Sequence, residues 1–372
     1  MAKILHSALL ETSAHPKEAC LFPLEKGGLA LFYDQDRRLM TRVSVDRGRT
    51  WGAAAPLKTA KGEGFRGNRT SPVRLRSGAI GLFYTHVPHV RRGRDGPLRF
   101  RVSKDEGRTW SDGVFVNPTF AVQRNGTARV VAKGRIVAPV FIWLSSLAGG
   151  ESESEDNSTC FSWTYFSDNE GATWKSSESE LLVRQNKGRD GYFSFEEPCI
   201  EELHDGRLLM FGRTELGRQF VSYSKDRGES WSEPQPGPLA SAYAPALLAR
   251  IAKTHDLLTI WNQVSPKEIL SGLHRHRLSC AVSSDDGKTW KHFRNLESRD
   301  DMAHIEPPAI KVYRMENYKY AGGWPARICY PSVAFLEDEA IISYDYGEID
   351  HNGKKGHATR VVVVPIEWFY EK

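Results

Sequence analysis

The chain contains 372 residues with a formal net charge of +5 at pH 7, and its basic residues are scattered apart from one cluster, RRGR at 91–94. This distribution argues against nucleic acid as a partner, although a surplus of Arg suits an anionic sugar. No run of 18 apolar residues occurs, so we expect no membrane-spanning helix. The five Cys form no C-x-x-C pair, which argues against a disulfide framework and against a zinc site.

The N-terminal stretch MAKILHSALLET has no apolar signal-peptide core, so we expect a cytoplasmic location. A secreted or periplasmic chain that had lost its signal would have the same sequence. A repeat pattern runs without interruption from about residue 20 to residue 368, which predicts a single domain over 1–372. The sequence leaves the oligomeric state open.

An octapeptide, SVDRGRTW at 44–51, returns four times along the chain. Its Ser opens a turn, its Asp accepts hydrogen bonds from nearby backbone N–H groups, its Gly supplies a positive φ, and its Trp packs onto the sheet. Five copies at near-constant spacing indicate a repeat architecture. The later copies are SKDEGRTW (103–110), SDNEGATW (167–174), SKDRGESW (224–231) and SSDDGKTW (283–290).

Each repeat also contains an apolar stretch that is typical of a buried strand. Five of the six stretches precede a copy of the octapeptide, and the sixth continues into the C-terminal stretch RVVVVPIEWF (360–369). We therefore predict an all-β, six-bladed propeller whose last blade is completed by the N-terminal stretch ILHSALLET (4–12), which would remove most exposed sheet edges. The six stretches are LALFY (29–33), AIGLFY (79–84), RIVAPVFIWL (135–144), RLLMFGR (207–213), DLLTIW (256–261) and EAIISY (339–344).

Two segments interrupt this pattern. Residues 145–158 are polar and acidic, which indicates a solvated loop. Residues 296–327 form a longer segment that holds Tyr318, Tyr320 and Trp324. A segment of that length is typical either of a ligand-facing loop or of a surface elaboration, and the sequence leaves both interpretations open.

The five octapeptides are Asp-boxes, and in them the chain resembles the sialidase superfamily of β-propellers. In that family the box joins the third and fourth strands of a blade on the rim, away from the catalytic face. The box therefore implies the fold rather than the activity. Ligands of propellers sit over the central channel at the ends of the innermost strands, so the starts of these strands are where reactive residues are expected.

Three segments resemble sialidase motifs at such strand starts. The segment SFEEPCIEELHDGRLLMFGR places Glu197 at the family's Glu and Arg213 at a carboxylate-binding Arg. The segment RHRLSCAVSSDDGKTW places Arg275 at a second carboxylate-binding Arg, although Arg277 points to the same side of the strand and remains an alternative. The segment ARICYPSVAFL places Tyr330 at the family's nucleophilic Tyr.

The resemblance implies a specific chemistry. A sialic acid carries a carboxylate on its anomeric carbon, which Arg side chains bind bidentately and which would repel a carboxylate nucleophile. The family therefore uses a neutral Tyr. Because free Tyr is a poor nucleophile with a pKa of about 10, a neighbouring Glu takes its proton as the bond forms. Glu197 and Tyr330 are the candidates for this pair.

The first blade departs from the family pattern. Sialidases carry Arg-Ile-Pro at the first strand of this blade, whereas HPKEACLFPLE stands here, so that Lys17 or Glu18 occupies the place of the Arg. One Arg of the carboxylate clamp is therefore missing, unless Arg66, Arg69 or Arg129 reaches in from another blade.

The family's acid/base Asp is also missing, because the corresponding stretch GEGFRGNRTSPVRL contains no Asp. Glu63 could serve as the acid, as could His86 or His89, although each also suits an ordinary loop position. His274 and His276 share one face of a strand, but no third ligand is apparent. We therefore predict neither a metal ion nor a cofactor.

These residues predict a retaining exo-glycoside hydrolase of the sialidase type that acts on terminal sialic acid or a related acidic sugar. Tyr330 would be the nucleophile, Glu197 its base, and Arg213 with Arg275 the carboxylate clamp. The first alternative is a hydrolase or lyase on uronic-acid-containing glycans, for which the histidines at 86, 89 and 274 are candidate groups together with Tyr330. The second alternative is a carbohydrate-binding propeller without catalysis.

Overall fold

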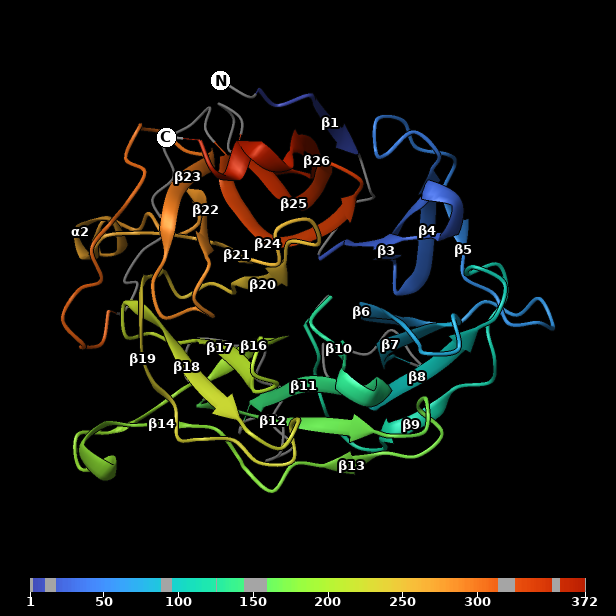
Figure 1. The fold of residues 1–372 in the computed structure, drawn as a ribbon, viewed down its shortest axis with the longest axis horizontal. Helices are drawn as coiled ribbons and strands as arrows, with labels where there is room; N and C mark the ends of the chain where they lie inside the picture. The colour runs from blue at the N-terminus through green and yellow to red at the C-terminus, as the bar shows by residue number, and fades with distance from the viewer. Residues whose placement is uncertain are drawn as a thin grey trace.

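Six four-stranded antiparallel sheets form a ring about a central axis in the part of the chain that the structure describes (Figure 1). This computed structural model describes residues 3–10, 18–87, 96–124, 126–143, 159–313, 325–349 and 355–371. The predicted all-β, six-bladed propeller is confirmed.

Five blades are built from four strands that follow one another along the chain. They are blade 1 with β2 (Cys20–Pro23), β3 (Leu29–Gln35), β4 (Arg38–Ser44) and β5 (Ala55–Pro56); blade 2 with β6 (Gly67–Arg74), β7 (Ile80–His86), β8 (Leu98–Ser103) and β9 (Val114–Asn117); blade 3 with β10 (Arg129–Val131), β11 (Arg135–Trp143), β12 (Cys160–Ser167) and β13 (Lys175–Ser176); blade 4 with β16 (Glu196–Glu202), β17 (Leu208–Arg213), β18 (Arg218–Ser224) and β19 (Gln235–Ala240); and blade 5 with β20 (Leu247–Arg250), β21 (Leu257–Trp261), β22 (Leu278–Ser283) and β23 (Lys291–Glu297).

The sixth blade joins the two ends of the chain. It contains β24 (Pro325–Leu336), β25 (Glu339–Ile349), β26 (Lys355–Pro365) and β1 (His6–Leu10). Strand β1 pairs with β26, so the predicted closure by the N-terminal strand is confirmed. The first strand of each blade contacts the first strand of the next, in the cyclic order β2, β6, β10, β16, β20, β24 and back to β2. These six strands therefore line the central channel.

A few short elements lie outside the blades. They are the hairpin β14 (Val183–Arg184) and β15 (Tyr192–Phe193), the helix α2 (Pro266–Leu270), and the 3-10 turns η1 (Glu25–Gly27), η2 (Ala132–Gly134), η3 (Gln185–Gly188) and η4 (Ile366–Phe369). Ser265 caps α2 through its side chain, which accepts a hydrogen bond from the Glu268 N–H. None of the helices among the described residues has the length and apolar character needed to cross a membrane.

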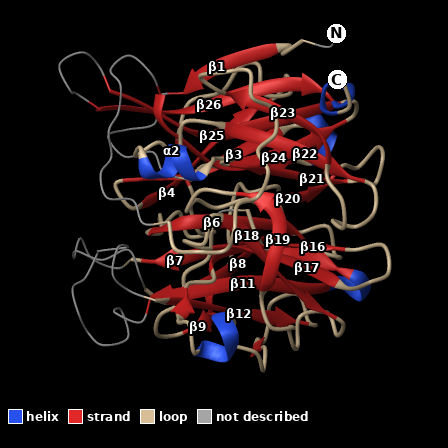
Figure 2. Cartoon of the chain, turned by 90° about the vertical axis from the view of Figure 1, so that its left-hand side faces the viewer, coloured by secondary structure: helices blue, strands red, loops and turns tan. Residues whose placement is uncertain are grey.

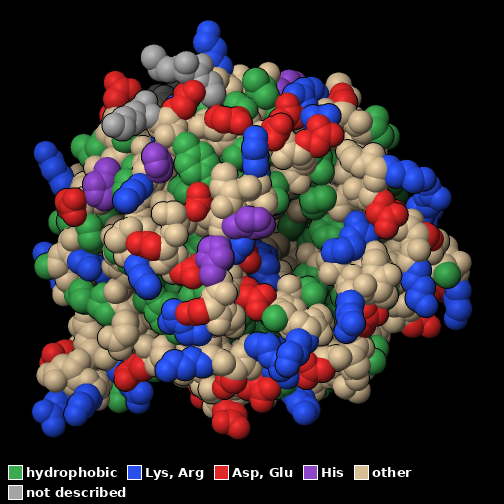
Figure 3. Space-filling view, in the orientation of Figure 1, with side chains coloured by type: hydrophobic (Ala, Val, Ile, Leu, Met, Phe, Trp, Pro, Cys, Tyr) green, Lys and Arg blue, Asp and Glu red, His purple; other side chains and the backbone are tan. Residues whose placement is uncertain are grey.

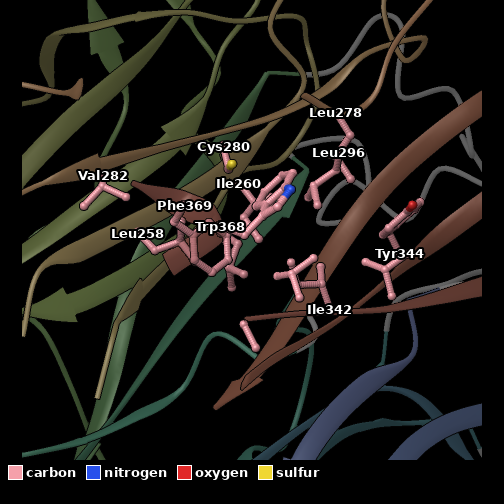
Figure 4. Packing of buried hydrophobic residues seen from close by; sticks show 14 of the residues in the cluster. Leu258, Ile260, Leu278, Cys280, Val282, Leu296, Ile342, Tyr344, Trp368 and Phe369 are labelled. Carbon is pink, nitrogen blue, oxygen red and sulfur yellow. The ribbon is translucent and has the colours of Figure 1, made fainter. Parts of the chain in front are cut away.

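The six apolar stretches predicted from the sequence are the second strands of the six blades. They are continuously apolar rather than alternating because both faces of each blade pack against a neighbouring blade. Figure 4 shows this packing between blades 5 and 6, where Leu258 and Ile260 of β21 and Leu278 of β22 share a buried cluster with Ile342 of β25 and Trp368 of η4. The core of the protein therefore lies between the blades.

The Asp-boxes form hydrogen-bonded turns after the third strands. In the fifth copy, the Ser283 hydroxyl donates to Asp285 Oδ1 at 2.8 Å and accepts from the Gly287 N–H at 2.8 Å. The Thr289 hydroxyl donates to Asp285 Oδ2 at 2.6 Å. Gly287 and the residue before it, Asp286, have φ values of 82° and 61°, so the turn needs two successive left-handed residues. The Ser bonds recur in the other four copies.

The two ends of the ring carry different connections. Seen edge-on in Figure 2, α2 lies at one end and the C-terminus lies at the other. Because α2 follows the second strand of blade 5, and second strands end where first strands start, the starts of the channel-lining strands are at the α2 end. The end with the C-terminus faces the viewer in Figure 3, where a central recess is flanked by charged and His side chains.

The long segment predicted at 296–327 is described up to residue 313. It turns back over blade 4, where the Tyr313 N–H donates to the Glu215 carbonyl at 2.9 Å and Arg218 donates to the Pro308 carbonyl. Residues 314–324 of this segment and the acidic stretch at 145–158 lie outside the described residues, and residues 325–327 begin β24.

Candidate active site

Four residues at the starts of channel-lining strands have a positive φ. They come from blades 1, 2, 4 and 6, and they are Glu18 (67°), Arg69 (55°), Glu197 (46°) and Tyr330 (56°). The last three lie in irregularities of the strand pairing, which are β-bulges that redirect a side chain. A non-glycine residue in this conformation costs on the order of 1 kcal/mol or more, and such strain concentrates at functional sites.

Two of these residues form a buried acid–phenol pair. The Tyr330 hydroxyl donates a hydrogen bond to Glu197 Oε1 at 2.9 Å. Burial, reinforced by the charge of Glu197, raises the pKa of Tyr330 well above its usual value. Burial also tends to raise the pKa of Glu197, but Arg213 and the more distant Arg124 outweigh it, so this pKa is lowered. The pair therefore holds one proton on Tyr330 beside an ionised carboxylate.

Arg213 is surrounded by two carboxylates and a second phenol. Its Nη1 atom donates to Glu197 Oε2 at 2.6 Å and lies 3.4 Å from Glu196 Oε1. The Tyr243 hydroxyl donates to the other oxygen of Glu196, and the Arg213 guanidinium lies 3.7 Å from the centre of the Tyr243 ring. Burial alone would lower the pKa of Arg213, but Glu196 and Glu197 raise it well above its usual value. Arg213 is therefore the buried counter-ion of both carboxylates.

Three further guanidinium groups face the ring of Tyr330. The Cζ atoms of Arg275, Arg327 and Arg124 lie 5.5, 5.5 and 5.8 Å from the ring centre. Arg275 is buried, and its Nη1 atom donates to the Cys329 thiol at 3.7 Å, which is a weak acceptor. Several guanidinium groups converging on one phenol create a strongly positive environment that suits an anion.

The sequence interpretation did not identify Arg124 or Arg327. Arg124 extends from blade 3 across the channel and donates to the carbonyls of Ala246 in blade 5 and Pro331 in blade 6. Arg327 stands three residues before Tyr330 in the same strand, which is the signal that could have revealed it. Arg124 offers no comparable signal, because it precedes a strand start without any motif.

Glu18 and Arg69 face each other between blades 1 and 2. Arg69 Nε lies 3.8 Å from Glu18 Oε2, and both side chains are buried. The Arg69 guanidinium is held 5.7 Å from the ring centres of Phe141 and Trp143. Arg69 therefore stands at the channel-lining strand of blade 2, where it faces a carboxylate of the protein.

A family described as a BNR repeat-like domain matches residues 34–346. The chain belongs to the BNR repeat-like family. Solved structures with a similar fold include a protein of unknown function from Dyadobacter fermentans, with 15% identity, a TM-score of 0.65, and coverage of 98% of this chain and 99% of that one. A sialidase from Trypanosoma rangeli shares 16% identity at a TM-score of 0.60, and the match covers 99% of this chain but 59% of the sialidase.

A third similar structure is an intramolecular trans-sialidase from Ruminococcus gnavus in complex with oseltamivir carboxylate, with 14% identity and a TM-score of 0.60, covering 100% of this chain and 98% of that one. At such identities the likeness shows the fold alone. This BNR-repeat propeller thus shares its fold with these sialidases, and its chemistry has to be argued from its own side chains.

Three residues predicted for the site have other partners in this BNR-repeat propeller. Arg129 Nε donates to Glu201 Oε2 at 2.9 Å. Glu63 is exposed on the turn before β6, and His86 Nδ1 is 3.2 Å from the Arg66 carbonyl oxygen. No contact of these three with Tyr330 or Glu197 is found among the described residues, and His89 lies outside them.

Arg275 and Arg277, the two alternatives for the second carboxylate-binding Arg, have different surroundings. Arg277 is fully buried away from Tyr330, with Nη2 2.9 Å from Glu268 Oε1 and 2.6 Å from Asp300 Oδ2. His274 is also buried, and burial together with the charge of Arg275 lowers its pKa to about 3. No cluster of three or more potential metal ligands is found among the described residues.

Proposed function

We propose that this propeller is a retaining exo-glycoside hydrolase of the sialidase type, acting on terminal sialic acid or a related acidic sugar. The observation that carries the proposal is the buried hydrogen bond from the Tyr330 hydroxyl to Glu197 Oε1 at 2.9 Å, faced by several guanidinium groups. A phenol beside an ionised carboxylate is the arrangement that general-base activation of a neutral nucleophile requires.

The proposed reaction begins with binding of the sugar carboxylate by the guanidinium groups next to Tyr330. Arg275 is the main candidate, because Arg213 already neutralises Glu196 and Glu197. Arg327 is a second candidate, although its Nη2 atom lies 3.6 Å from Asp345 Oδ2. The Tyr330 oxygen then attacks the anomeric carbon while its proton passes to Glu197. A neutral phenol approaches a sugar carboxylate without the repulsion that a carboxylate nucleophile would meet. The partner is accordingly an acidic glycan.

A fluorogenic methylumbelliferyl sialoside tests the proposal. We expect turnover by the unaltered protein and a loss of at least about 1000-fold in the Tyr330→Phe variant. Tyr344→Phe is a matched control, because the Tyr344 hydroxyl also donates to a carboxylate, Glu297 Oε1, at 2.8 Å. This second contact lies between blades 5 and 6, where Arg360 also pairs with Glu297. A folded protein that hydrolyses no sialoside, or a Tyr330→Phe variant as active as the Tyr344→Phe variant, would contradict the proposal.

One observation favours a lyase on uronic-acid-containing glycans as the second candidate. His274 is neutral at ordinary pH and lies within the electrostatic reach of Arg275 and Arg213, so a base would stand beside groups that neutralise a uronate. Cleavage by elimination creates a double bond in the product. An ultraviolet absorbance that increases with a uronate glycan, but not with a sialoside, would identify the lyase, and sugar binding without turnover would identify a binding module.

A further inference from the structure

Four buried carboxylates of the described residues belong to the hydrogen-bond and ion-pair network that includes Tyr330, and three of them accept hydrogen bonds. Glu197 accepts from Tyr330 and Arg213, and Glu196 accepts from Tyr243. Asp345 Oδ1 accepts from the backbone N–H of Glu18 at 2.9 Å. Neither oxygen of the fourth carboxylate, Glu18, accepts a hydrogen bond from a described residue, and its Oε2 atom is buried.

Glu18 is nevertheless fixed in place. Its backbone N–H is tied to blade 6 by the bond to Asp345, and its φ is positive at 67°. Arg69 Nε is 3.8 Å from Glu18 Oε2, which is an ion-pair distance but too long for a hydrogen bond. Glu18 also acts on Tyr330 through space, since its charge contributes to raising the pKa of Tyr330. A buried carboxylate with an unused oxygen near the proposed nucleophile is ready to bond a ligand hydroxyl or glycosidic oxygen.

We infer that Glu18 is the general acid and base of the reaction, a role that rests on the proposed function. As the Tyr330 oxygen bonds to the anomeric carbon and its proton moves to Glu197, the glycosidic C–O bond breaks. Its electron pair stays on the leaving oxygen, which takes the proton of Glu18. In the second half, Glu18 removes a proton from water, the water oxygen bonds to the anomeric carbon, and the released Tyr330 oxygen recovers its proton from Glu197.

The charge of the substrate supports this assignment. The free site holds an ionised Glu197 together with Arg69 and the other guanidinium groups. A bound sugar carboxylate neutralises part of this positive charge and adds a negative one, which favours the protonated form of a neighbouring acid.

The other two candidates for the general acid, Glu63 and His86, lie in less suitable surroundings. Glu63 is exposed on a hairpin turn in which its N–H donates to Thr59 Oγ1 at 3.3 Å. His86 Nδ1 is occupied by the Arg66 carbonyl, and burial lowers the pKa of His86, so a proton on its ring is disfavoured. Neither residue contacts the other site residues in the described part of the chain.

Two substrates with different leaving groups test the role of Glu18. Methylumbelliferol departs with little help from an acid, whereas the lactose of sialyl-lactose needs a proton. We expect Glu18→Gln to lower kcat/KM for sialyl-lactose by about 100-fold or more, and for the methylumbelliferyl sialoside by less than about 10-fold. Added azide needs no general base, so it should accelerate the variant on the aryl substrate and yield the sialyl azide.

The outcomes separate this inference from the proposed function. If the unaltered protein hydrolyses neither substrate, the proposed function fails and the role of Glu18 fails with it. If the unaltered protein hydrolyses both substrates, the Glu18→Gln variant decides. An equal loss of kcat/KM on the two substrates, or no acceleration of the variant by azide, would show that Glu18 merely supports the structure. The same leaving-group dependence in Glu63→Gln instead of Glu18→Gln would also overturn the assignment.

Discussion

Replacing Arg213 by Met removes the counter-ion of two buried carboxylates. Arg213 is 2% exposed, and its partners Glu196 and Glu197 are 0% and 3% exposed. Met keeps the length of the side chain, so the change leaves little empty space but removes the positive partner of two buried carboxylates. A buried charge that loses its partner costs much more free energy than the intact pair contributed.

We expect the free energy of unfolding of Arg213→Met to fall by about 3–5 kcal/mol at neutral pH, which is the usual cost of removing one partner of a buried ion pair. A chain of 372 residues unfolds with an entropy of about 0.8 kcal/mol/K, taking about 2.1 cal/mol/K for each residue. The melting temperature should therefore fall by about 4–6 °C. The loss should also depend on pH, because each carboxylate escapes its penalty by binding a proton.

The direction of that pH dependence follows from the pKa of Glu197. In the unaltered protein this pKa is lowered below its ordinary value of 4.5, so the stabilisation is fully present above pH 4.5 and is lost as the pH falls through the lowered pKa. Without Arg213, burial favours the protonated carboxyl, so the variant should gain stability as the pH falls from 8 towards 5. The difference between the two proteins should therefore be largest at pH 8.

Urea unfolding at pH 5 and pH 8 measures both effects. Arg135→Met is the matched control, because Arg135 is equally buried but its partners Asp168 and Glu229 are 55% and 48% exposed and can be solvated once they are alone. We expect this control to lose less than half as much stability and to show no larger loss at pH 8 than at pH 5. A loss below about 1 kcal/mol in Arg213→Met, or one that is equal at the two pH values, would refute the reasoning.

Three further predictions concern the pair and the scaffold. The acidic limb of kcat/KM should lie below pH 4.5, because the pKa of Glu197 is lowered and its carboxylate must be ionised to accept the Tyr330 proton. The raised pKa of Tyr330 should keep this phenol protonated through pH 10. A pH–rate profile with its acidic limb near pH 6 would contradict the first expectation. Asp285→Ala should cost about 2–3 kcal/mol in urea unfolding and Asp285→Asn clearly less, because Asn169 makes the equivalent bonds in the third box, at 2.9 Å to both Ser167 and the Thr173 N–H; equal losses would contradict it. Gly228→Ala should lower the stability by about 2 kcal/mol, because φ is +91° and the new Cβ would lie 2.9 Å from Val137. Gly78→Ala, with φ +87° and open space around it, should lower the stability by about 1 kcal/mol, and the reverse order in thermal unfolding would refute the packing argument.

Much of the fold could be predicted because each blade repeats the same local chemistry. The Asp-box specifies a turn through bonds within eight consecutive residues, as Ser283 and Asp285 show. The second strands are evident because both of their faces are buried, which makes them continuously apolar. Even the ring closure followed from the sequence. The last blade has only three C-terminal strands, β24, β25 and β26, so its fourth strand has to come from the N-terminus.

The acid–phenol pair was within reach of the sequence for the same reason. Glu197 and Tyr330 each stand at the start of the innermost strand of their blade, so a propeller directs both towards one channel although they are far apart along the chain. The partners of Arg213 were not predictable in this way. Strict alternation would place Glu196 and Glu197 on opposite faces of β16, whereas a bulge after Glu196 and a positive φ at Glu197 bring both within reach of one guanidinium.

The sequence by itself determined the number of blades, the strands that build them, and the two candidate residues, Glu197 and Tyr330, that motifs marked. The tertiary structure alone decided which charges meet at the channel. Glu18 bonds to Asp345 across 327 positions of the chain, and Arg124 reaches carbonyls 122 and 207 positions away. Such contacts leave no local pattern, because they arise from closing the ring and packing six strand starts around one axis.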